Sequence, residues 1–137
     1  MATINGTGND DSLPGTPNAD TITGGGGNDI IQGLGGGDSL LGEAGGDLLE
    51  GGADGDTLDG GAGTDTLDGG LGDDSLDGGT ENDTLRGGEG ADTVEGGDGA
   101  DSLLGDVGED TILGGEGGDT IGDLSVDGAD SIDGGPG

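Results

Sequence analysis

The sequence predicts an all-β fold, namely a right-handed parallel β-solenoid with two short-stranded parallel sheets and about 18 residues per coil. Three observations predict it. Residues 6–122 divide without a gap into thirteen units of nine residues, the sixth position of every unit is Asp, and the eighth position is always aliphatic. A chain of such short, regular units stacks neighbour on neighbour and does not form a globular core.

Each unit combines a loop with a short strand. Position 1 is always Gly, positions 2 and 4 are mostly Gly, and position 7 is Ser or Thr in eleven units. We predict that positions 1–6 form a loop, in which Gly permits left-handed backbone angles. Positions 7–9, such as residues 57–59, form a strand whose position 8 points inward. Odd-numbered strands then build one sheet and even-numbered strands the other. The predicted core side chains are Leu13, Ile22, Ile31, Leu40, Leu49, Leu58, Leu67, Leu76, Leu85, Val94, Leu103, Ile112 and Ile121.

The period also predicts the domain organisation. Residues 1–5 are expected to be an N-terminal lead-in, residues 6–122 the repeat array, and residues 123–137 a degraded fourteenth repeat with a truncated end. After Gly122 the pattern slips by two residues, and "SVDGADSID" places Asp130 and Ile132 at the two diagnostic positions. A collagen triple helix is excluded because Gly does not recur at every third residue. A featureless linker has no reason to keep Asp and an aliphatic residue two positions apart through thirteen copies.

The composition excludes several classes of function. The chain has 42 Gly, no aromatic residue, no Cys and no His, and its 32 acidic residues face the single basic residue Arg86, which is expected to be a solvated surface charge. Nucleic acid is excluded as a partner because nothing neutralises its phosphates. The opening "MATINGTGND" predicts no cleavable signal peptide, and no apolar run is long enough for membrane insertion. Without His, Lys or Cys, an enzyme is not expected.

A cation is the partner that this charge pattern indicates. The formal charge is −31, and aspartates stacked along each loop edge repel one another. Loop carbonyls that Gly leaves free to turn inward, together with these carboxylates, form an all-oxygen site. Ca²⁺ suits such a site better than Mg²⁺, because it accepts six to eight oxygen ligands in a tolerant geometry. We expect several ions, up to about eleven, between stacked loops. Without them we expect disorder, because the core is small for so much flexible chain.

Units such as "GGGGNDIIQ", "GGADGDTLD" and "GGLGDDSLD" resemble the RTX, or haemolysin-type, calcium-binding nonapeptide repeat GGxGxDxUx. The resemblance covers about nine-tenths of the chain. It implies a calcium-filled parallel β-roll in a secreted, extracellular bacterial protein. It also implies that a larger parent protein leaves the cell unfolded through type I secretion machinery and folds in extracellular calcium.

The resemblance also implies the metal ligands. Its side-chain ligands are the position-6 aspartates Asp11, Asp20, Asp29, Asp38, Asp47, Asp56, Asp65, Asp74, Asp83, Asp92, Asp101, Asp110 and Asp119. Backbone carbonyls come from loop residues such as Gly25, Gly27, Gly52, Gly61, Gly63, Gly70, Gly72, Gly88, Gly90, Gly97 and Gly99. Weaker sites are expected where the motif departs from the family pattern, as in "GTGNDD", "GTPNAD" and "GTENDT".

The functional hypothesis is therefore a calcium-dependent folding module. An alternative is a calcium-stabilised surface-recognition module of the adhesin or ice-binding type, in which position 7 presents rows of Ser and Thr hydroxyls. Acidic residues at position 9, such as Asp59 and Asp77, argue against this alternative because they place charge beside each row. Uncapped terminal coils favour end-to-end self-association.

Overall fold

The computed structural model describes residues 1–122 and 129–137 and is made of strands and loops. One parallel sheet has eight strands in the spatial order β1 (Thr3–Asn5), β3 (Thr21–Gly26), β5 (Ser39–Ala44), β7 (Thr57–Ala62), β9 (Ser75–Thr80), β11 (Thr93–Gly99), β13 (Thr111–Gly117) and β15 (Ser131–Asp133). The other has seven strands in the order β14 (Thr120–Gly122), β12 (Ser102–Val107), β10 (Thr84–Glu89), β8 (Thr66–Leu71), β6 (Leu48–Ala53), β4 (Ile30–Gln32) and β2 (Ser12–Pro14). The part of the chain that the structure describes contains no helix that could cross a bilayer.

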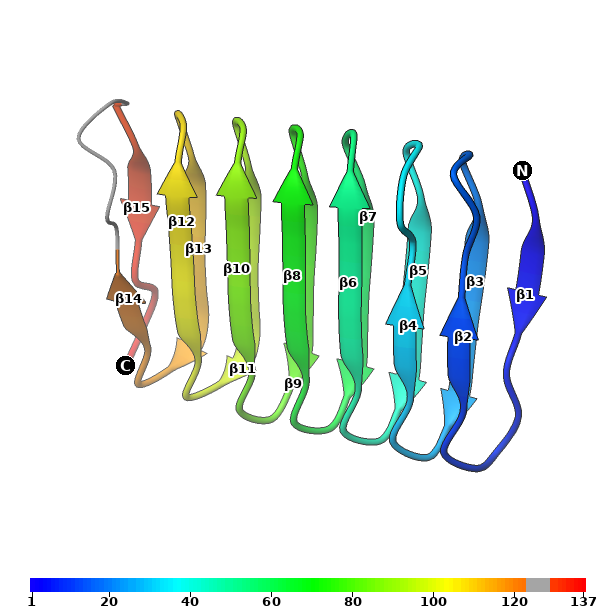
Figure 1. The fold of residues 1–137 in the computed structure, drawn as a ribbon. Coiled ribbons are helices and arrows are strands. Elements are labelled where there is room, and N and C mark those ends of the chain that lie inside the picture. The colour runs from blue at the N-terminus through cyan, green and yellow to red at the C-terminus, as the bar shows by residue number, and fades with distance from the viewer. Residues whose placement is uncertain (123–128) are drawn as a thin grey trace.

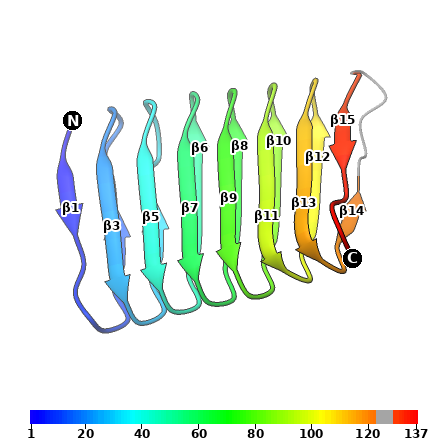
Figure 2. The same ribbon diagram turned by 180° about the vertical axis from the view of Figure 1, so that it is seen from behind.

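The predicted solenoid is confirmed. Even-numbered strands run upward at the front of Figure 1, odd-numbered strands run downward behind them, and the chain advances from right to left, so the coil is right-handed. Figure 2 shows the eight-stranded sheet from its own side. Residues 18 apart are partners in the ladder, as Leu58 is with Leu40 and Leu76. Two repeats therefore make one coil.

The strands are longer than the sequence pattern predicts. Most central strands have six residues and include positions 1–3 of the following repeat, as in β7 and β8. The prediction of a six-residue loop was therefore wrong, because the ladder continues past position 9 and only positions 4–6 reverse the chain. The glycines of positions 1–3 form strand backbone here, where they allow a close approach between coils.

Both ends of the solenoid extend beyond the thirteen units. Thr3–Asn5, within the expected lead-in, form β1 and pair with β3. At the other end Ile132 pairs with Ile112, a separation of 20 residues that corresponds to the two-residue slip in the sequence. Residues 123–128, which include the first part of the degraded fourteenth repeat, lie outside the described residues.

Position 8 supplies the core, as predicted. The aliphatic side chains from Ile22 to Ile112 are almost fully buried between the two sheets, and Ile4, Leu13 and Ile121 pack partly buried at the ends. Alternation along each strand buries positions 8 and 1 and leaves positions 7 and 9 toward solvent. With no aromatic residue, the core is a single stack of aliphatic side chains.

Truncating one core leucine should therefore be costly. Leu67 and Leu71 lie in the same strand β8, but Leu67 is 1% exposed and Leu71 is 50% exposed. We expect Leu67→Ala to lower the free energy of unfolding of the calcium-loaded protein by about 2–5 kcal/mol. Leu71→Ala should stay within about 0.5 kcal/mol of the wild type. Urea unfolding checks both, and equal losses would contradict this assignment of the core.

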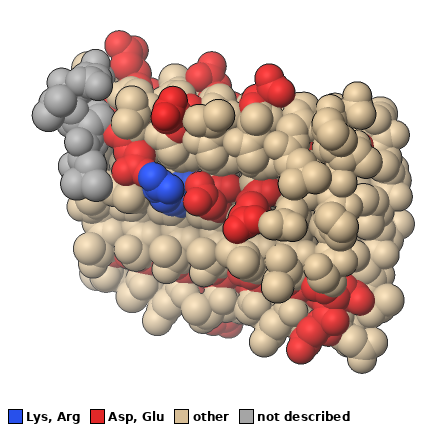
Figure 3. All heavy atoms as spheres, in the orientation of Figure 1, with Lys and Arg blue, Asp and Glu red and all other residues tan. Residues whose placement is uncertain are grey.

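The surface is acidic except at one point. Figure 3 shows the single basic side chain bordered by carboxylates on the face of the seven-stranded sheet. Arg86 pairs with Asp106 and lies 3.7 Å from Asp68, one coil away on either side. The hydrogen bond to Asp106 and its charge raise the pKa of Arg86. The expectation of a merely solvated Arg86 was incomplete, because this side chain bridges three consecutive coils.

Candidate calcium sites

The position-6 aspartates of all thirteen repeats lie in the loops at the two long edges of the solenoid. Eleven of these carboxylates, from Asp29 to Asp119, meet the loop one coil before them: the N–H of one aspartate donates to the Oδ1 of the aspartate 18 residues later, at 2.7–3.0 Å. One edge carries Asp11, Asp29, Asp47, Asp65, Asp83, Asp101 and Asp119, and the other carries Asp20, Asp38, Asp56, Asp74, Asp92 and Asp110. The Oδ1 atoms thus fix the spacing of successive loops.

The second carboxylate oxygen has no hydrogen-bond donor over most of the array. The Oδ2 atoms concerned are buried, and they belong to Asp29, Asp38, Asp47, Asp56, Asp65, Asp74, Asp83, Asp92, Asp101 and Asp119. A buried carboxylate oxygen without a partner is costly. Its recurrence through the array indicates a binding requirement, because an isolated packing error would not repeat with the period of the sequence. A cation is the ligand that an acceptor-only oxygen attracts.

Backbone carbonyls converge on the same places. A Cβ atom on Gly60 would lie 2.6 Å from Oδ2 of Asp65 and 2.7 Å from the carbonyl oxygen of Gly78 in the next coil. The position-1 glycines from Gly24 to Gly114 all have 2.3–2.7 Å from the Cβ position to the aspartate Oδ2, and all except Gly87 and Gly105 also have a carbonyl oxygen of the next coil among the nearest atoms. Position 1 thus leaves open a small cradle that is bordered by a carboxylate oxygen and a carbonyl oxygen.

The glycines proposed from the sequence as carbonyl ligands lie in the same repeats, at position 2 within most central strands and at position 4 mainly in the turns that follow. A Cβ on Gly70 would lie 2.4 Å from the carbonyl oxygen of Gly52, and one on Gly63 would lie 1.7 Å from the carbonyl oxygen of Gly45. Carbonyls at positions 2 and 4 therefore point along the solenoid axis toward the next coil. The carbonyls of position 1 were missed by the sequence analysis, although Gly at position 1 of every unit was the available signal.

The chemistry of this donor set fits a hard cation. Among the described residues no three acidic side chains form a cluster that could hold a metal by themselves. Each gap between loops instead offers carboxylate oxygens together with carbonyl oxygens. All-oxygen sites of mixed carboxylates and carbonyls are those that Ca²⁺ prefers.

Some repeats keep a glycine-type backbone conformation at a cost in strain. Leu34, Glu43 and Asp106 replace Gly at position 2, yet their φ angles are 80°, 75° and 73°. At position 4, Glu81 has φ 78°, and its Oε2 accepts a hydrogen bond of 3.0 Å from the N–H of Gly63. Side chains rarely adopt this left-handed region, and such strain concentrates at functional sites.

Burial makes several of the central position-6 carboxylates hard to ionise. Desolvation, aided by the like charge one coil away, raises the pKa of Asp56, Asp74 and Asp92 to about 6 and the pKa of Asp83 to about 7. Desolvation also raises the pKa of Asp38, Asp47, Asp65 and Asp101. A positively charged partner would therefore stabilise the ionised form of each of these carboxylates.

Filling the position-1 cradle should damage the site. We expect Gly60→Ala to cost about 1–3 kcal/mol, because its methyl group must displace the carboxylate of Asp65 or the carbonyl of Gly78. Gly35→Ala is the matched control, since a Cβ at Gly35 meets nothing within 4 Å. Thermal unfolding at fixed calcium should separate the two variants. If they unfold alike, a Cβ at position 1 does not disturb the carboxylate and the carbonyl beside it.

A comparison with known families identifies the repeat. The family model of the RTX calcium-binding nonapeptide repeat matches residues 4–40, 14–49, 41–76, 50–85, 68–103 and 86–121. The search of curated proteins found no match to the chain. Repeats of this family bind calcium in a structural module. The family matches span most of the solenoid, and the chain therefore belongs to the RTX calcium-binding nonapeptide repeat family.

Proposed function

We propose that this chain is a calcium-dependent folding module, disordered without calcium and ordered by it. The observation that carries the proposal is the periodic row of buried Oδ2 atoms without donors. In each gap the Oδ2 of one loop and the position-1 carbonyl of the next would hold the ion, while carbonyls at positions 2 and 4 complete its shell. Calcium would supply the positive charge that the array otherwise lacks.

Charge supports the same conclusion. The chain carries a formal charge of −31, with Arg86 as its single basic residue. Folding brings the carboxylates of successive coils together, so repulsion grows as the solenoid forms. Because each coil contacts only its neighbours, an ion that joins two loops also prepares the next pair of loops. Calcium-driven folding is therefore expected to be cooperative.

The biological setting is a proposal that rests on the family. RTX repeat proteins are typically secreted by type I systems. We propose the same route for this chain, with low calcium inside the cell keeping it unfolded and extracellular calcium folding it. The repeats supply no catalytic group, and end-to-end association of solenoids through their strand edges stays a prediction.

A calcium titration followed by far-UV circular dichroism tests the proposal. We expect a steep change from a coil spectrum to a β spectrum with calcium, and little change with magnesium at the same concentration. Magnesium is the matched control because it demands a tight octahedron and dehydrates reluctantly. A coil spectrum that persists in millimolar calcium, or an equal response to both ions, would overturn the proposal.

A second candidate function has one favourable observation. The position-7 hydroxyls of the eight-stranded sheet form an exposed row in exact ladder register, and its members are Thr3, Thr21, Ser39, Thr57, Ser75, Thr93, Thr111 and Ser131. Ile30 and Leu48 interrupt the corresponding row of the other sheet. Ordered water or ice is the ligand that such a row would suit. Thermal hysteresis by the calcium-loaded protein, lost in Thr57→Lys, would support this function, and its absence in the wild type would exclude ice binding.

A further inference from the structure

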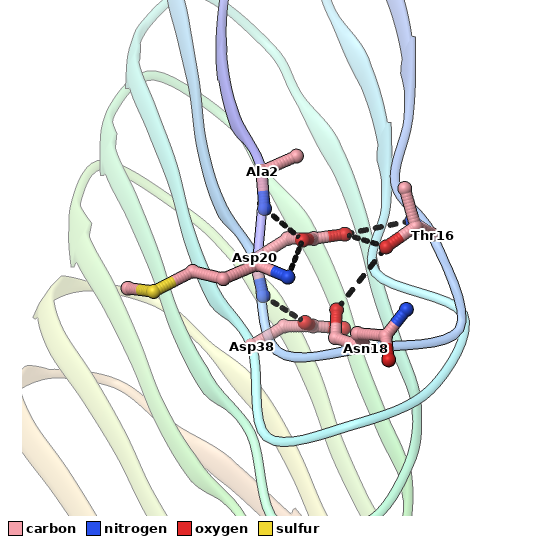
Figure 4. A network of polar contacts seen from close by, with 6 residues as sticks. Ala2, Thr16, Asn18, Asp20 and Asp38 are labelled. Carbon is pink, nitrogen blue, oxygen red and sulfur yellow. Dashed lines mark hydrogen bonds and ion pairs between the residues drawn. The ribbon is translucent and has the colours of Figure 1, made fainter.

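The first two loops differ from most later loops in the hydrogen bonding of the aspartate Oδ2 atom. Figure 4 shows the second loop, where Oδ2 of Asp20 accepts hydrogen bonds from both the N–H and the hydroxyl of Thr16, each at 2.7 Å. In the first loop Oδ2 of Asp11 accepts the N–H of Thr7 at 2.7 Å and its hydroxyl at 2.8 Å. These are the oxygens that lack a donor in the later loops.

The backbone φ angle at position 2 also separates the first two repeats from the later ones. From Gly25 to Gly115 every residue at position 2 has a positive φ, whether it is Gly or not, but Thr7 and Thr16 do not. A β-branched residue resists the left-handed region more strongly than other side chains do. With Thr at position 2 the N–H turns toward the carboxylate of its own loop. The sequence difference thus changes which atoms face the site.

The carboxylates have also moved relative to the position-1 cradle. A Cβ on Gly6 would lie 3.1 Å from Oδ2 of Asp11, and the three atoms nearest to a Cβ on Gly15 do not include Asp20. In the later repeats the corresponding distance is 2.3–2.7 Å. Two donors now point at Oδ2 in each early loop, and donor hydrogens repel a cation.

We propose that the first two loops are a metal-independent N-terminal cap, in which Thr7 and Thr16 take the place that calcium holds in the later loops. This inference rests on the proposed function. Both oxygens of Asp20 are satisfied by hydrogen bonds, since Oδ1 also accepts the N–H of Ala2. The calcium-loaded array begins with the next two aspartates, Asp29 and Asp38.

Equilibrium dialysis against calcium on the full chain tests the cap by counting ions bound at saturation. The double variant Thr7→Gly/Thr16→Gly restores the glycine pair and should bind about two more ions than the wild type, one for each released carboxylate. Thr7→Val/Thr16→Val keeps the β-branched side chain and the backbone N–H donor and should bind as many ions as the wild type. Calcium binding with equal stoichiometry in all three proteins would overturn the cap and leave the proposed function standing. Absence of calcium binding in all three would overturn both.

A second measurement protects the test against a Gly variant that does not fold. In calcium-saturated wild type, NMR hydrogen exchange should show the amide protons of Thr7 and Thr16 protected, with scalar couplings across the hydrogen bonds to the carboxyl carbons of Asp11 and Asp20. Amide protons that exchange freely in an otherwise folded, calcium-loaded protein would overturn the cap.

Discussion

Asp65→Asn is expected to stabilise the calcium-free fold and to weaken the calcium-bound one. Oδ1 of Asp65 accepts the N–H of Asp47 at 2.7 Å, and Asn can keep this bond, while Oδ2 is buried without a donor. Burial raises the pKa of Asp65, so removing its charge removes a desolvation cost from the calcium-free fold. The amide group cannot replace the lost carboxylate ligand, and at calcium a hundredfold above its Kd one lost ion removes about 2.7 kcal/mol of stabilisation.

The two effects are measured separately. The concentration of trimethylamine N-oxide that folds the calcium-free chain should fall in Asp65→Asn, because this osmolyte favours burial. The calcium midpoint should rise and the number of bound ions should drop. Asp77→Asn removes the same charge from an exposed position in β9 and should change both midpoints little. If Asp65→Asn and Asp77→Asn behave alike, the Oδ2 of Asp65 is not a ligand.

Acidification of the calcium-free chain is expected to promote folding. Desolvation raises the pKa of Asp56, Asp74 and Asp92 to about 6 and that of Asp83 to about 7, from 3.8. A group whose pKa is higher in the folded state binds its proton more tightly there, so its contribution is complete below the unfolded value and is lost as the pH rises through the folded value. The calcium-free fold should therefore be most stable near pH 4 and lose stability up to about pH 7.

Calcium reverses the direction of this pH dependence. Ion binding requires deprotonated carboxylates, so the calcium midpoint should fall as the pH rises from 5 to 8. Far-UV circular dichroism at several pH values, with a chelator and with saturating calcium, measures both trends. A calcium-free chain that gains β signal on alkalinisation would contradict the assignment of the raised pKa values to buried, unpartnered carboxylates.

The repeat made much of the fold predictable. The constant spacing of Asp and an aliphatic residue in every unit predicted that position 8 faces inward in every coil. The buried side chains from Ile22 to Ile112 confirm this prediction. The strand length was not predictable from periodicity. Ladder pairing continues through positions 1–3 because glycine backbone fits between neighbouring coils, and a glycine-rich stretch in a sequence otherwise indicates a loop.

The candidate sites were predictable in part. The spacing of the aspartates predicted two rows of carboxylates. It did not predict that Oδ1 accepts a backbone N–H while Oδ2 lacks a donor, because this depends on the hydrogen bonds of the folded chain. The motifs "GTGNDD" and "GTPNAD" were recognised as departures from the repeat. The sequence did not predict that the N–H groups of Thr7 and Thr16 donate to the aspartates of their own loops, because residue types alone do not determine the direction of the backbone N–H.

A crystal structure of the calcium-loaded chain, with anomalous scattering used to locate calcium, tests the central claim most directly. We expect calcium in the gaps between consecutive loops, within about 2.3–2.6 Å of the Oδ2 atoms of central aspartates such as Asp47, Asp65 and Asp83. Calcium found on exposed carboxylates such as Asp77, with those Oδ2 atoms still lacking a partner, would contradict it.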